Sequence, residues 1–363
     1  MLVTERSPDG TNSRSQLTAR RLRCSQMSSI ELWEPAAAFE QLESWLADEL
    51  RDGESADVYL GYGLSETLRR EPRPSPPEPA ALPLLAAQRG ASNRLLQGSV
   101  RIGEWQATWS PEQYTVAVDE VRAAIARGDV YQVNLVQHLA ASYEGDPRAL
   151  ETALGPLHTR SFHTDAYSIV SASPELFLAR RGSRLWTKPI KGTRPIGEDV
   201  DDEKDAAEHV MIVDLERNDL SRVCEPGSIR WPELMAQHEL AGVTHLVSTV
   251  EGTLRDGVTL AEILRATFPG GSITGAPKIA AIDQIARLEP VGRGASMGAL
   301  GTVHANGDFD LVLTIRTFAV VDGRVHLWVG GGVVWDSDPE AEIEESWVKA
   351  RPLLARVGGL LPV

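Results

Sequence analysis

The sequence contains little cysteine and no long apolar run. Only two cysteines, Cys24 and Cys224, occur in 363 residues, and they are far apart in the chain. This spacing excludes a disulfide framework or a cysteine-rich zinc site, and a reducing, cytoplasmic setting is expected. No apolar stretch approaches the roughly 20 residues that a membrane-spanning helix needs, so no membrane partner is expected.

Positive charge is also scarce. The chain has 36 lysine and arginine residues against 51 aspartate and glutamate residues, which gives a formal net charge of −15. Proteins that bind nucleic acid need a surplus of basic residues along the phosphate backbone, so we expect no nucleic-acid partner. A small anionic ligand would need local cations or a metal ion at its site.

The amino-terminal end has no periodic hydrophobic pattern and no apolar core of a secretory signal. We expect residues 1–29 to form a flexible tail, or an extension upstream of a start at Met27. The stretch "EPRPSPPEPAALP" at 71–83 is too rich in proline for regular structure and is typical of a linker or long loop. The chain then divides into this tail, a short amino-terminal portion (30–105) and a core (106–363).

Hydrophobic periodicity predicts helices interspersed with strands paired in hairpins. Ser110 is suited to cap a helix that has Pro111 in its first turn and Gln113 in a capping box. Asp322-Gly323 predicts a tight hairpin turn. We expect strands at 130–141, 166–172, 185–190, 243–253, 298–304, 309–320 and 324–335, and helices at 34–50, 110–128, 148–154, 203–215, 259–267, 277–287 and 339–354. This succession predicts an α+β fold.

Two distant segments each place carboxylates on one face of a predicted helix. Asp205 and Glu208 are three residues apart, and Glu342, Glu345 and Lys349 follow the same spacing rule. Each set alone is also typical of an ordinary solvated helix face, where such ion pairs contribute little. Two sets together favour a site for a hard divalent cation, because Mg²⁺ prefers oxygen ligands.

Glycine-rich stretches mark places where the backbone approaches another group closely. "PGGSITGAPK" has the glycine spacing of a P-loop but lacks its Lys-Ser/Thr, which excludes a nucleotide site of that kind. Gly330 to Gly332 are compatible with a bulge, with crowded packing, or with amide groups exposed to an anion. Arg316, His245 and Glu175 are polar residues among apolar neighbours. A buried histidine is usually only hydrogen-bonded, whereas a buried arginine needs an anionic partner.

The stretch "PIKGTRPIG" places Lys191 between an apolar dipeptide and a Gly-Thr turn. The pattern alone is compatible with a surface charge beside a turn and with a buried, reactive amine. A reactive amine must be uncharged to attack, so burial or a nearby cation would have to favour its neutral form.

Taken together, the motifs resemble those of the chorismate-utilising enzymes, a family that includes anthranilate synthase component I, aminodeoxychorismate synthase component I, and the isochorismate and salicylate synthases. The motifs, in order, are "SPELF", "PIKGT", "AEHVMIVDLERNDLSRV", "THLVS", "PGGSITGAPK", "TIRTF", "GGGVVWDSDPEAEIEES" and "KA". The resemblance covers about residues 106–354. It implies two packed antiparallel β-sheets with helices on the outside.

The resemblance also implies a substrate and a set of site residues. Chorismate carries two carboxylates, and a bound Mg²⁺ would make this dianion tolerable in an acidic protein. Catalytic roles would fall to Lys191, Glu175 and His245. Metal ligation would fall to Glu208 and Glu345, with Asp205 and Glu342 acting through water. Substrate contacts would come from Gly192, Thr193, Thr274, Gly275, Ser296, Arg316, Gly330, Gly332, Lys349 and Gln132.

Two positions bear on which reaction the resemblance implies, and a third bears on substrate binding. Isochorismate and salicylate synthases carry a water-activating lysine where this chain has Gln132. Anthranilate synthases usually have alanine where this chain has Lys191, and a lysine there resembles aminodeoxychorismate synthase component I. Ser296 stands where most relatives carry an aromatic residue, which affects one contact to the side-chain carboxylate of the substrate.

The implied reaction converts chorismate and ammonia to 4-amino-4-deoxychorismate in folate (para-aminobenzoate) biosynthesis. The ammonia would come from a separate glutamine amidotransferase subunit, because neither cysteine lies in a glutaminase nucleophile motif. The alternatives are anthranilate synthase component I and a non-catalytic chorismate-binding paralogue. The presence of Glu175, Lys191, Glu208 and Glu345 argues against the paralogue.

Overall fold

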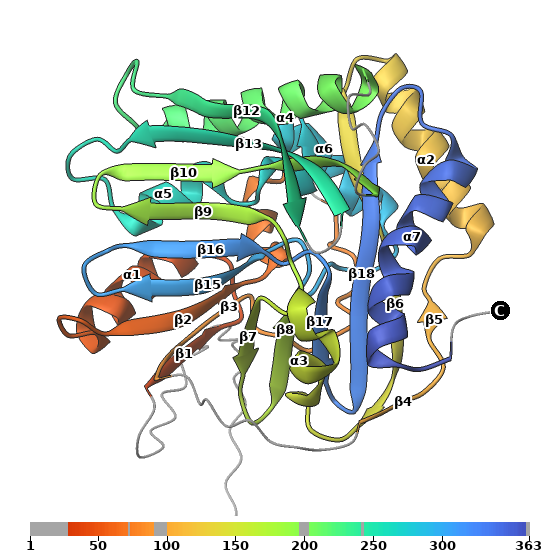
Figure 1. Cartoon of the computed structure of the whole chain (residues 1–363), viewed down its shortest axis with the longest axis horizontal. Coiled ribbons are helices and arrows are strands. Elements are labelled where there is room, and N and C mark those ends of the chain that lie inside the picture. Colours follow the sequence, from red (N-terminus) through yellow and green to blue (C-terminus); the bar gives the residue numbers. More distant parts are fainter. Residues whose placement is uncertain (1–27, 72, 91–99, 196–202, 241–242, 361–363) are drawn as a thin grey trace, which may run out of the picture.

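The computed structural model describes residues 28–71, 73–90, 100–195, 203–240 and 243–360, although the side chains of 193–195, 203–205, 240 and 243 lie outside the description. In these described ranges, two antiparallel sheets, one of ten and one of eight strands, form the core (Figure 1). Helices flank both sheets. The predicted α+β class with two antiparallel sheets is therefore confirmed.

The ten-stranded sheet combines the amino-terminal portion with the core. Leu60 of one portion pairs with Ala299 of the other, so residues 30–105 do not form a separate layer. Ser29 already belongs to the first strand, so the predicted tail does not reach it; residues 1–27 lie outside the described part. The strand order is β1 (Ser29–Leu32), β3 (Leu85–Arg89), β2 (Ser55–Leu60), β15 (Ala299–His304), β16 (Phe309–Leu313), β9 (Leu176–Arg181), β10 (Arg184–Lys188), β13 (Val243–Thr253) and β11 (Ile190–Pro195), with β12 (Arg230–Leu240) on β13.

The eight-stranded sheet is built around one long strand, β6, which has partners along both edges. The predicted turn at Asp322-Gly323 is confirmed, because both residues have positive φ and Val321 pairs with Arg324. The strand order is β14 (Gly275–Ala276), β6 (Gln132–Glu144), β18 (Arg324–Val333), β17 (Thr317–Val321), β8 (Tyr167–Ser171) and β7 (Arg160–His163), with β4 (Arg101–Ile102) and β5 (Gln106–Ala107) also on β6.

Helices α1, α4 and α5 pack beside the ten-stranded sheet, and α2, α3 and α7 flank the eight-stranded sheet (Figure 1). The predicted capping box is present, because Ser110 and Gln113 exchange side-chain and backbone hydrogen bonds at the start of α2. None of the described helices is both long and apolar enough to cross a bilayer. The helices are α1 (Ala38–Glu49), α2 (Pro111–Ala126), α3 (Ala149–Leu154), α4 (Glu203–Ser221), α5 (Leu260–Thr267), α6 (Lys278–Leu288) and α7 (Pro339–Val357), with short 3₁₀ turns η1 (Tyr62–Leu68), η2 (Gly155–Leu157) and η3 (Gly271–Ile273).

One predicted strand was wrong in its extent. The run 309–320 is not continuous: β16 belongs to the ten-stranded sheet and β17 to the eight-stranded sheet. The chain crosses between the sheets at Thr314 to Arg316, where Arg316 adopts φ 50°. Both strands are apolar, so hydrophobicity alone could not reveal the left-handed residue that separates them.

Candidate active site

Glu175 precedes β9 and is only 6% exposed. Ser272 Oγ donates a hydrogen bond to Glu175 Oε1 over 2.7 Å, and the backbone of Ile190 donates a second one. Burial raises the pKa of this carboxyl, while the hydrogen bond from Ser272 and the charges of Lys191 and Arg316 oppose the rise. A carboxyl in this environment is suited to carry a proton and to act as an acid.

Lys191 and Gly192 lie on β11, which pairs with β13. Lys191 is opposite Leu246, Thr193 is opposite His245, and the pairing is irregular between them, where Gly192 has φ 60°. His245 Nδ1 lies 3.3 Å from Gly192 O. Burial lowers the pKa of His245, so this ring is neutral near pH 7 and is suited to position the β11 backbone. The side chain of Thr193 lies outside the described part.

His209 on α4 was not predicted as a site residue, yet it faces the same side of the sheet as Lys191. Residues opposite each other in an antiparallel pair share a face, as do residues two apart along a strand. Lys191 therefore shares a face with Leu246 and Ser248, and Ser248 Oγ lies 2.6 Å from His209 Nε2. Burial and the charge of Lys191 lower the pKa of His209 to about 4. His209 therefore adds no positive charge beside the amine.

The segment "PGGSITGAPK" connects the two sheets at this site. Ser272 contacts Glu175 beside the ten-stranded sheet, and Gly275 pairs with Val133 of the eight-stranded sheet. Three residues span at most about 10 Å of chain. Predicted site residues that lie on or beside different sheets, such as Glu175 and Gly275, are therefore brought close together.

Thr274 and Gly275 are held against β6 by backbone contacts. Thr274 is fully buried, and its carbonyl accepts a hydrogen bond of 2.8 Å from the backbone of Asn134. Gly275 has φ 136°, and a Cβ at this position would overlap the carbonyl of Gln132. Only glycine fits there, so the position depends on close backbone approach.

The glycines of β18 leave room for neighbouring side chains. The amide of Gln132 occupies the space that a side chain at Gly332 would fill. Gln132 is fully buried, and neither its Nε2 nor its Oε1 has a hydrogen-bond partner among the described residues. A buried amide without a partner is costly in the folded protein, which makes it suited to contact a ligand. On the same strand, the carbonyl of Gly330 accepts a hydrogen bond of 2.8 Å from Lys349.

Helix α7 brings two of the predicted acids to β18. Glu345 Oε1 lies 2.6 Å from Lys349 Nζ. Glu342 Oε2 and Glu345 Oε1 lie 3.4 and 3.2 Å from the point that a Cβ at Gly331 would occupy. The two carboxylates therefore converge beside Gly331, where the Lys349 ammonium also lies 3.4 Å from the same point.

The predicted magnesium set is only partly covered by the described side chains. Glu208 is a half-buried residue of α4, whereas the side chain of Asp205 lies outside the described part. Within the described ranges, no three His, Cys, Asp or Glu side chains gather as a metal site. The convergence of Glu342 and Glu345 fits a hard cation, because Mg²⁺ takes carboxylate oxygens and keeps several waters. Magnesium binding stays a prediction.

Arg316 and Ser296 lie in loops beside the crossing between the sheets. The carbonyl of Arg316 accepts a hydrogen bond from the backbone of Ala172 over 3.0 Å. The guanidinium of Arg316 interacts electrostatically with Glu175. Left-handed backbone at a bulky residue is typical of functional sites. Ser296 is fully buried and donates its hydroxyl proton to Thr314 O at 3.2 Å, so this hydroxyl can only accept a hydrogen bond from a ligand.

A buried acidic pair on α4 was missed. Glu216 Oε1 accepts a hydrogen bond of 2.9 Å from the backbone of Gly271, next to the serine that contacts Glu175. Burial and the nearby Asp219 raise the pKa of Glu216 to about 8. Lys278 Nζ lies 2.5 Å from Asp219 Oδ2. The two acids lie one turn apart, and Glu216 shares a helix face with the buried Ile212, Val213 and Leu220, a pattern that could have identified them.

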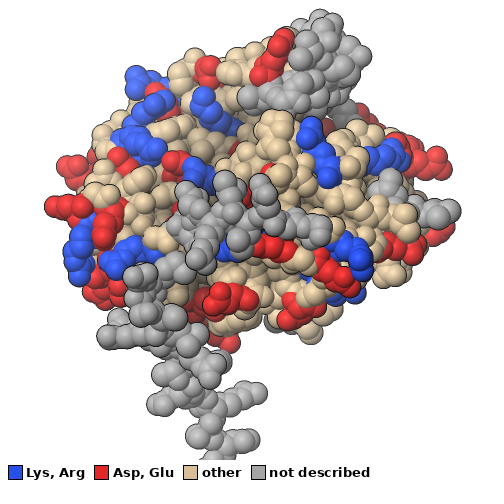
Figure 2. Space-filling view, turned by 60° about the horizontal axis from the view of Figure 1, so that its bottom comes forward, with Lys and Arg blue, Asp and Glu red and all other residues tan. Residues whose placement is uncertain are grey.

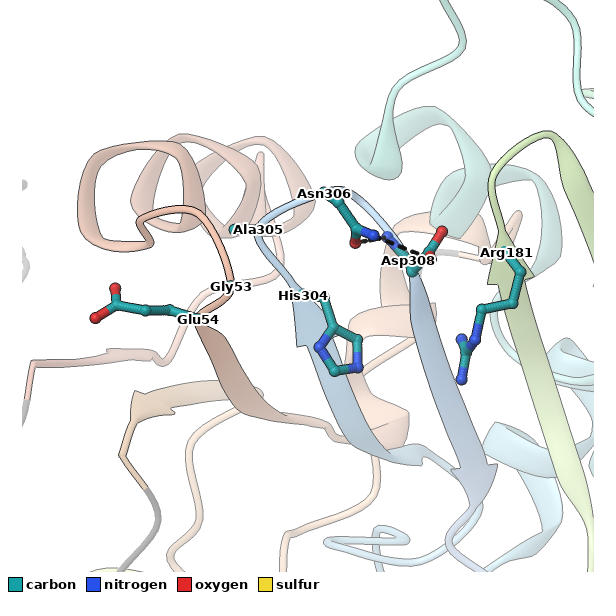
Figure 3. Close-up of a pocket in the computed structure, with 7 residues that line it drawn as sticks. All are labelled: Gly53, Glu54, Arg181, His304, Ala305, Asn306 and Asp308. Carbon is teal, nitrogen blue, oxygen red and sulfur yellow. Dashed lines mark hydrogen bonds between the residues drawn. The ribbon is translucent and has the colours of Figure 1, made fainter.

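The protein also has a surface cavity of about 280 Å³ that contains none of the predicted site residues (Figure 3). It lies at the turn between β15 and β16, where Asn306 Nδ2 donates to Asp308 Oδ2 over 3.1 Å. Its lining residues are Gly53, Glu54, Arg181, His304, Ala305, Asn306 and Asp308. Asn306 and Asp308 bond to each other within the turn, whereas Arg181 pairs with Asp310 and Glu54 accepts from Arg51 N. We assign the cavity no function.

Basic and acidic side chains are interspersed over the face shown in Figure 2. On the described part of this face, the net negative charge is therefore spread over the surface and does not form one patch. An anion would depend on cations at the site itself, such as Arg316 and Lys349.

Two curated relatives illustrate the similarity of this chain to known proteins. Anthranilate synthase component 1 of Streptomyces coelicolor is 39% identical over 315 residues, covering 81% of this chain and 59% of that protein. Aminodeoxychorismate synthase component 1 of Klebsiella aerogenes is 41% identical over 265 residues, covering 69% of this chain and 59% of that protein. The chain thus spans about three fifths of the length of the relatives it matches, and identity alone does not separate the two kinds.

A solved structure has the same fold. Anthranilate synthase component I from Streptococcus pneumoniae matches with a TM-score of 0.76 and 24% identity, covering 94% of this chain and 95% of that one. The family described as chorismate binding enzyme matches residues 25–355, which includes the amino-terminal portion as well as the eight motifs. The chain therefore belongs to the chorismate binding enzyme family.

Proposed function

We propose that this chain is aminodeoxychorismate synthase component I, which converts chorismate and ammonia to 4-amino-4-deoxychorismate. The observation that carries the proposal is the placement of Lys191 on β11, close enough to the buried carboxyl of Glu175 for the two groups to interact electrostatically. An amine and a protonated acid at one site are what nucleophilic displacement of a hydroxyl requires.

The proposed mechanism uses Lys191 as nucleophile and Glu175 as general acid. The lysine amine adds to C2 of chorismate, the C4–O bond breaks, and Glu175 protonates the departing hydroxyl, which leaves as water. Ammonia then adds at C4 and the bond between C2 and Lys191 breaks, which returns the amine. Glu175 regains its proton from the new ammonium group. The raised pKa of Glu175 favours this role, because burial favours the protonated form of the carboxyl.

The two carboxylates of chorismate would be bound by separate groups. Arg316, Lys349 and backbone amides near Gly330 and Gly332 would contact one of them. Glu208 and Glu345 would hold Mg²⁺ beside the other, with Asp205 and Glu342 behind them. When bound, the ion would neutralise a carboxylate that the acidic side chains would otherwise repel.

We further propose that the ammonia comes from a separate glutamine amidotransferase subunit and that the reaction takes place in the cytoplasm. The relatives are named as component 1, in agreement with a second subunit. Cys224 is an unsuitable glutaminase nucleophile, because it is buried and its pKa is raised by burial to about 11.

Anthranilate synthase component I is the second candidate. Among the two relatives described above, the anthranilate synthase matches the larger share of this chain. By resemblance, His245 matches a histidine that is tied to loss of pyruvate in anthranilate synthases. The two candidates differ in their products: the first retains the enolpyruvyl group, and the second releases pyruvate and forms a fluorescent aromatic acid.

The test is incubation of the purified chain with chorismate, ammonium and Mg²⁺, followed by mass analysis of the products. We expect 4-amino-4-deoxychorismate with the enolpyruvyl group retained, and no product when glutamine replaces ammonium. Anthranilate and pyruvate would identify the second candidate. Absence of turnover under all conditions would identify a non-catalytic chorismate-binding protein and overturn the proposal.

A further inference from the structure

A fully buried ion pair lies behind the candidate active site. Arg293 and Glu289 have side chains that are 1% and 2% exposed. Arg293 Nε donates to Glu289 Oε2 at 2.9 Å, and Arg293 Nη2 donates to Glu289 Oε1 at 2.7 Å. A buried pair of this kind is often no more stabilising than apolar residues of the same size. Its presence is therefore better explained by the other groups that it binds.

The pair of Glu289 and Arg293 supplies hydrogen-bond partners to backbone groups along one edge of β6. Beyond the two residues that pair with β14, the backbone carbonyl of Asn134 and the backbone N–H of Val136 point to the same edge. Arg293 Nη2 donates to Asn134 O at 2.7 Å, and Glu289 Oε1 accepts from Val136 N at 3.1 Å. The arginine thus donates where the N–H of a neighbouring strand would, and the glutamate accepts where its carbonyl would.

The same arginine binds the segment that carries Thr274. Arg293 Nη1 donates to Ile273 O at 2.8 Å, and the carbonyl of Thr274 accepts from Asn134 N at 2.8 Å. The guanidinium therefore contacts both β6 and the segment paired with it. A β-pairing of two residues is too short to be stable by itself, so it depends on such additional contacts.

The pair also connects the site with the amino-terminal portion. The ring of Tyr62 lies 4.5 Å from the guanidinium carbon of Arg293, within the range of a cation–π contact. On either side of this arginine, Gly292 N donates to Pro77 O at 2.9 Å and Gly294 N donates to Glu78 Oε2 at 3.0 Å. The proline-rich stretch that the sequence marked as a linker is therefore packed against this loop.

We propose that Glu289 and Arg293 are positioning residues, which hold Thr274 and Gly275 against β6 so that these residues can orient the substrate ring. The inference rests on the proposed function, because it assigns the substrate to this site. Neither residue touches the reacting atoms. A shift of about 1 Å in such a segment is enough to lower a rate about 100-fold.

The test compares Arg293→Lys with a variant of matched stability. Lysine keeps the positive charge but has a single nitrogen, which cannot take the places of Nε, Nη1 and Nη2 that bind Glu289, Ile273 O and Asn134 O. Leu154→Ala is the control, because Leu154 is fully buried in a separate cluster beside α3 and α7. We expect Arg293→Lys to lower kcat for chorismate about 100-fold with little change in KM. Leu154→Ala, assayed where the two variants are equally folded, should keep kcat within about twofold of the wild type, because it leaves this edge intact.

Hydrogen exchange tests the positioning role of Arg293 independently of the proposed function. The amides of Tyr131, Asn134 and Val136 are bonded across this edge of β6. They should exchange faster in Arg293→Lys than in Leu154→Ala, whatever the substrate is. Unchanged exchange at 131–136, or a kcat equal to that of the control, would overturn the inference. If the wild-type chain did not convert chorismate, the proposed function would fail, and exchange would still decide whether the pair holds this edge.

Discussion

The two sheets bring different kinds of groups to the candidate active site. Beside the ten-stranded sheet, Glu175 is 6% exposed and His245 is 1% exposed, and both make hydrogen bonds within the protein. On the side of the eight-stranded sheet, the side chains of Glu345 and Lys349 are 52% and 33% exposed. Electrostatic interactions are strong where water is excluded and are screened where it is not.

Because of this difference, we assign the chemical steps to the buried side and the binding of charged groups to the open side. On the buried side, small changes in hydrogen bonding alter which groups carry protons, and so they alter the rate of the chemical step. On the open side, the exposed groups of Glu345 and Lys349 exchange readily with water and ions, as a site for a charged substrate and a hydrated cation must, whereas Glu342 is buried. We therefore expect substitutions beside the ten-stranded sheet to lower kcat, and those on α7 to weaken metal or substrate binding.

The largest expected effect is that of Lys191→Ala, which tests the buried side directly. Removal of the nucleophile should lower kcat for aminodeoxychorismate formation by more than about 1000-fold, as removal of nucleophiles does in other enzymes. The matched control is Lys188→Ala, because Lys188 lies on the preceding strand β10, which also pairs with β13, and is 39% exposed and 3.6 Å from Glu233. Amination by Lys191→Ala at an undiminished rate would show that the lysine forms no bond to the substrate.

Glu175→Gln should have the next largest effect. Loss of the general acid should lower kcat about 10²- to 10⁴-fold. In the wild type, kcat should fall as pH rises through the raised pKa of Glu175, because the acid form is the active one. Glu233→Gln is the control, since this glutamate contacts Thr249 on the surface of the same sheet. A Glu175→Gln variant with wild-type kcat would exclude the acid role.

Ser272→Ala examines the same acid through its hydrogen bond. The bond from Ser272 stabilises the charged form of Glu175 and so lowers its pKa. Its removal should shift the alkaline fall of kcat to higher pH by about one unit, the size expected for one hydrogen bond to a charged group. The measurement is a pH profile of kcat. A shift to lower pH would contradict the proposed protonation state.

On the open side, Glu345→Gln should act on metal binding. We expect the Mg²⁺ concentration for half-maximal activity to rise about 10- to 100-fold, with a smaller effect on kcat at saturating metal. Glu344→Gln is the control, because Glu344 directly precedes Glu345 on α7 and pairs with Arg351 at the surface. Equal Mg²⁺ dependence in the two variants would show that Glu345 is not a ligand of the metal ion.

Local patterns in the sequence predicted much of the fold. The capping box at Ser110 and Gln113 and the turn at Asp322-Gly323 depend on residues close together in the chain, and both are present. The break at Arg316 was not predictable, because a left-handed conformation at this residue is imposed by the crossing between two sheets. Short strands such as β1 and β7 were missed because four residues carry too little periodicity.

The candidate site was less accessible to such reasoning. Resemblance identified Glu175 and Lys191 by motif, but the pKa shift of Glu175 and the contacts of both residues depend on partners distant in the chain. Ser272 is separated from Glu175 by almost a hundred residues. Arg293 binds the carbonyl of Asn134, which is still farther away in the sequence. Contacts of this kind follow from the packing of the two sheets and leave no local pattern.

The smallest expected effect concerns stability. It tests whether the burial of a group, rather than its place in one sheet or the other, determines whether it is charged. His138 and His326 are buried in the eight-stranded sheet, away from the exposed ions of α7. His138 Nε2 lies 3.0 Å from His326 Nδ1, and His138 Nδ1 lies 2.7 Å from Thr108 Oγ1. Burial, followed by its histidine partner and Arg324, lowers the pKa of His138 to about 3, and burial followed by Arg324 lowers that of His326 to about 4.

Because both pKa values are lower in the folded chain than the ordinary 6.5, the unfolded chain binds more protons between pH 6.5 and 4. The stability contributed by the neutral pair is therefore complete above pH 6.5 and is lost as pH falls toward 4. Urea unfolding of the wild type and of His138→Leu/His326→Leu should give free energies that differ by on the order of 5 kcal/mol more at pH 7.5 than at pH 4.5. The buried Glu78, whose pKa is raised by burial to about 7, acts in the opposite direction but is present in both proteins and cancels in the difference. Parallel stability curves would show that these histidines titrate normally, and burial alone would then not explain the contrast between the two sides of the site.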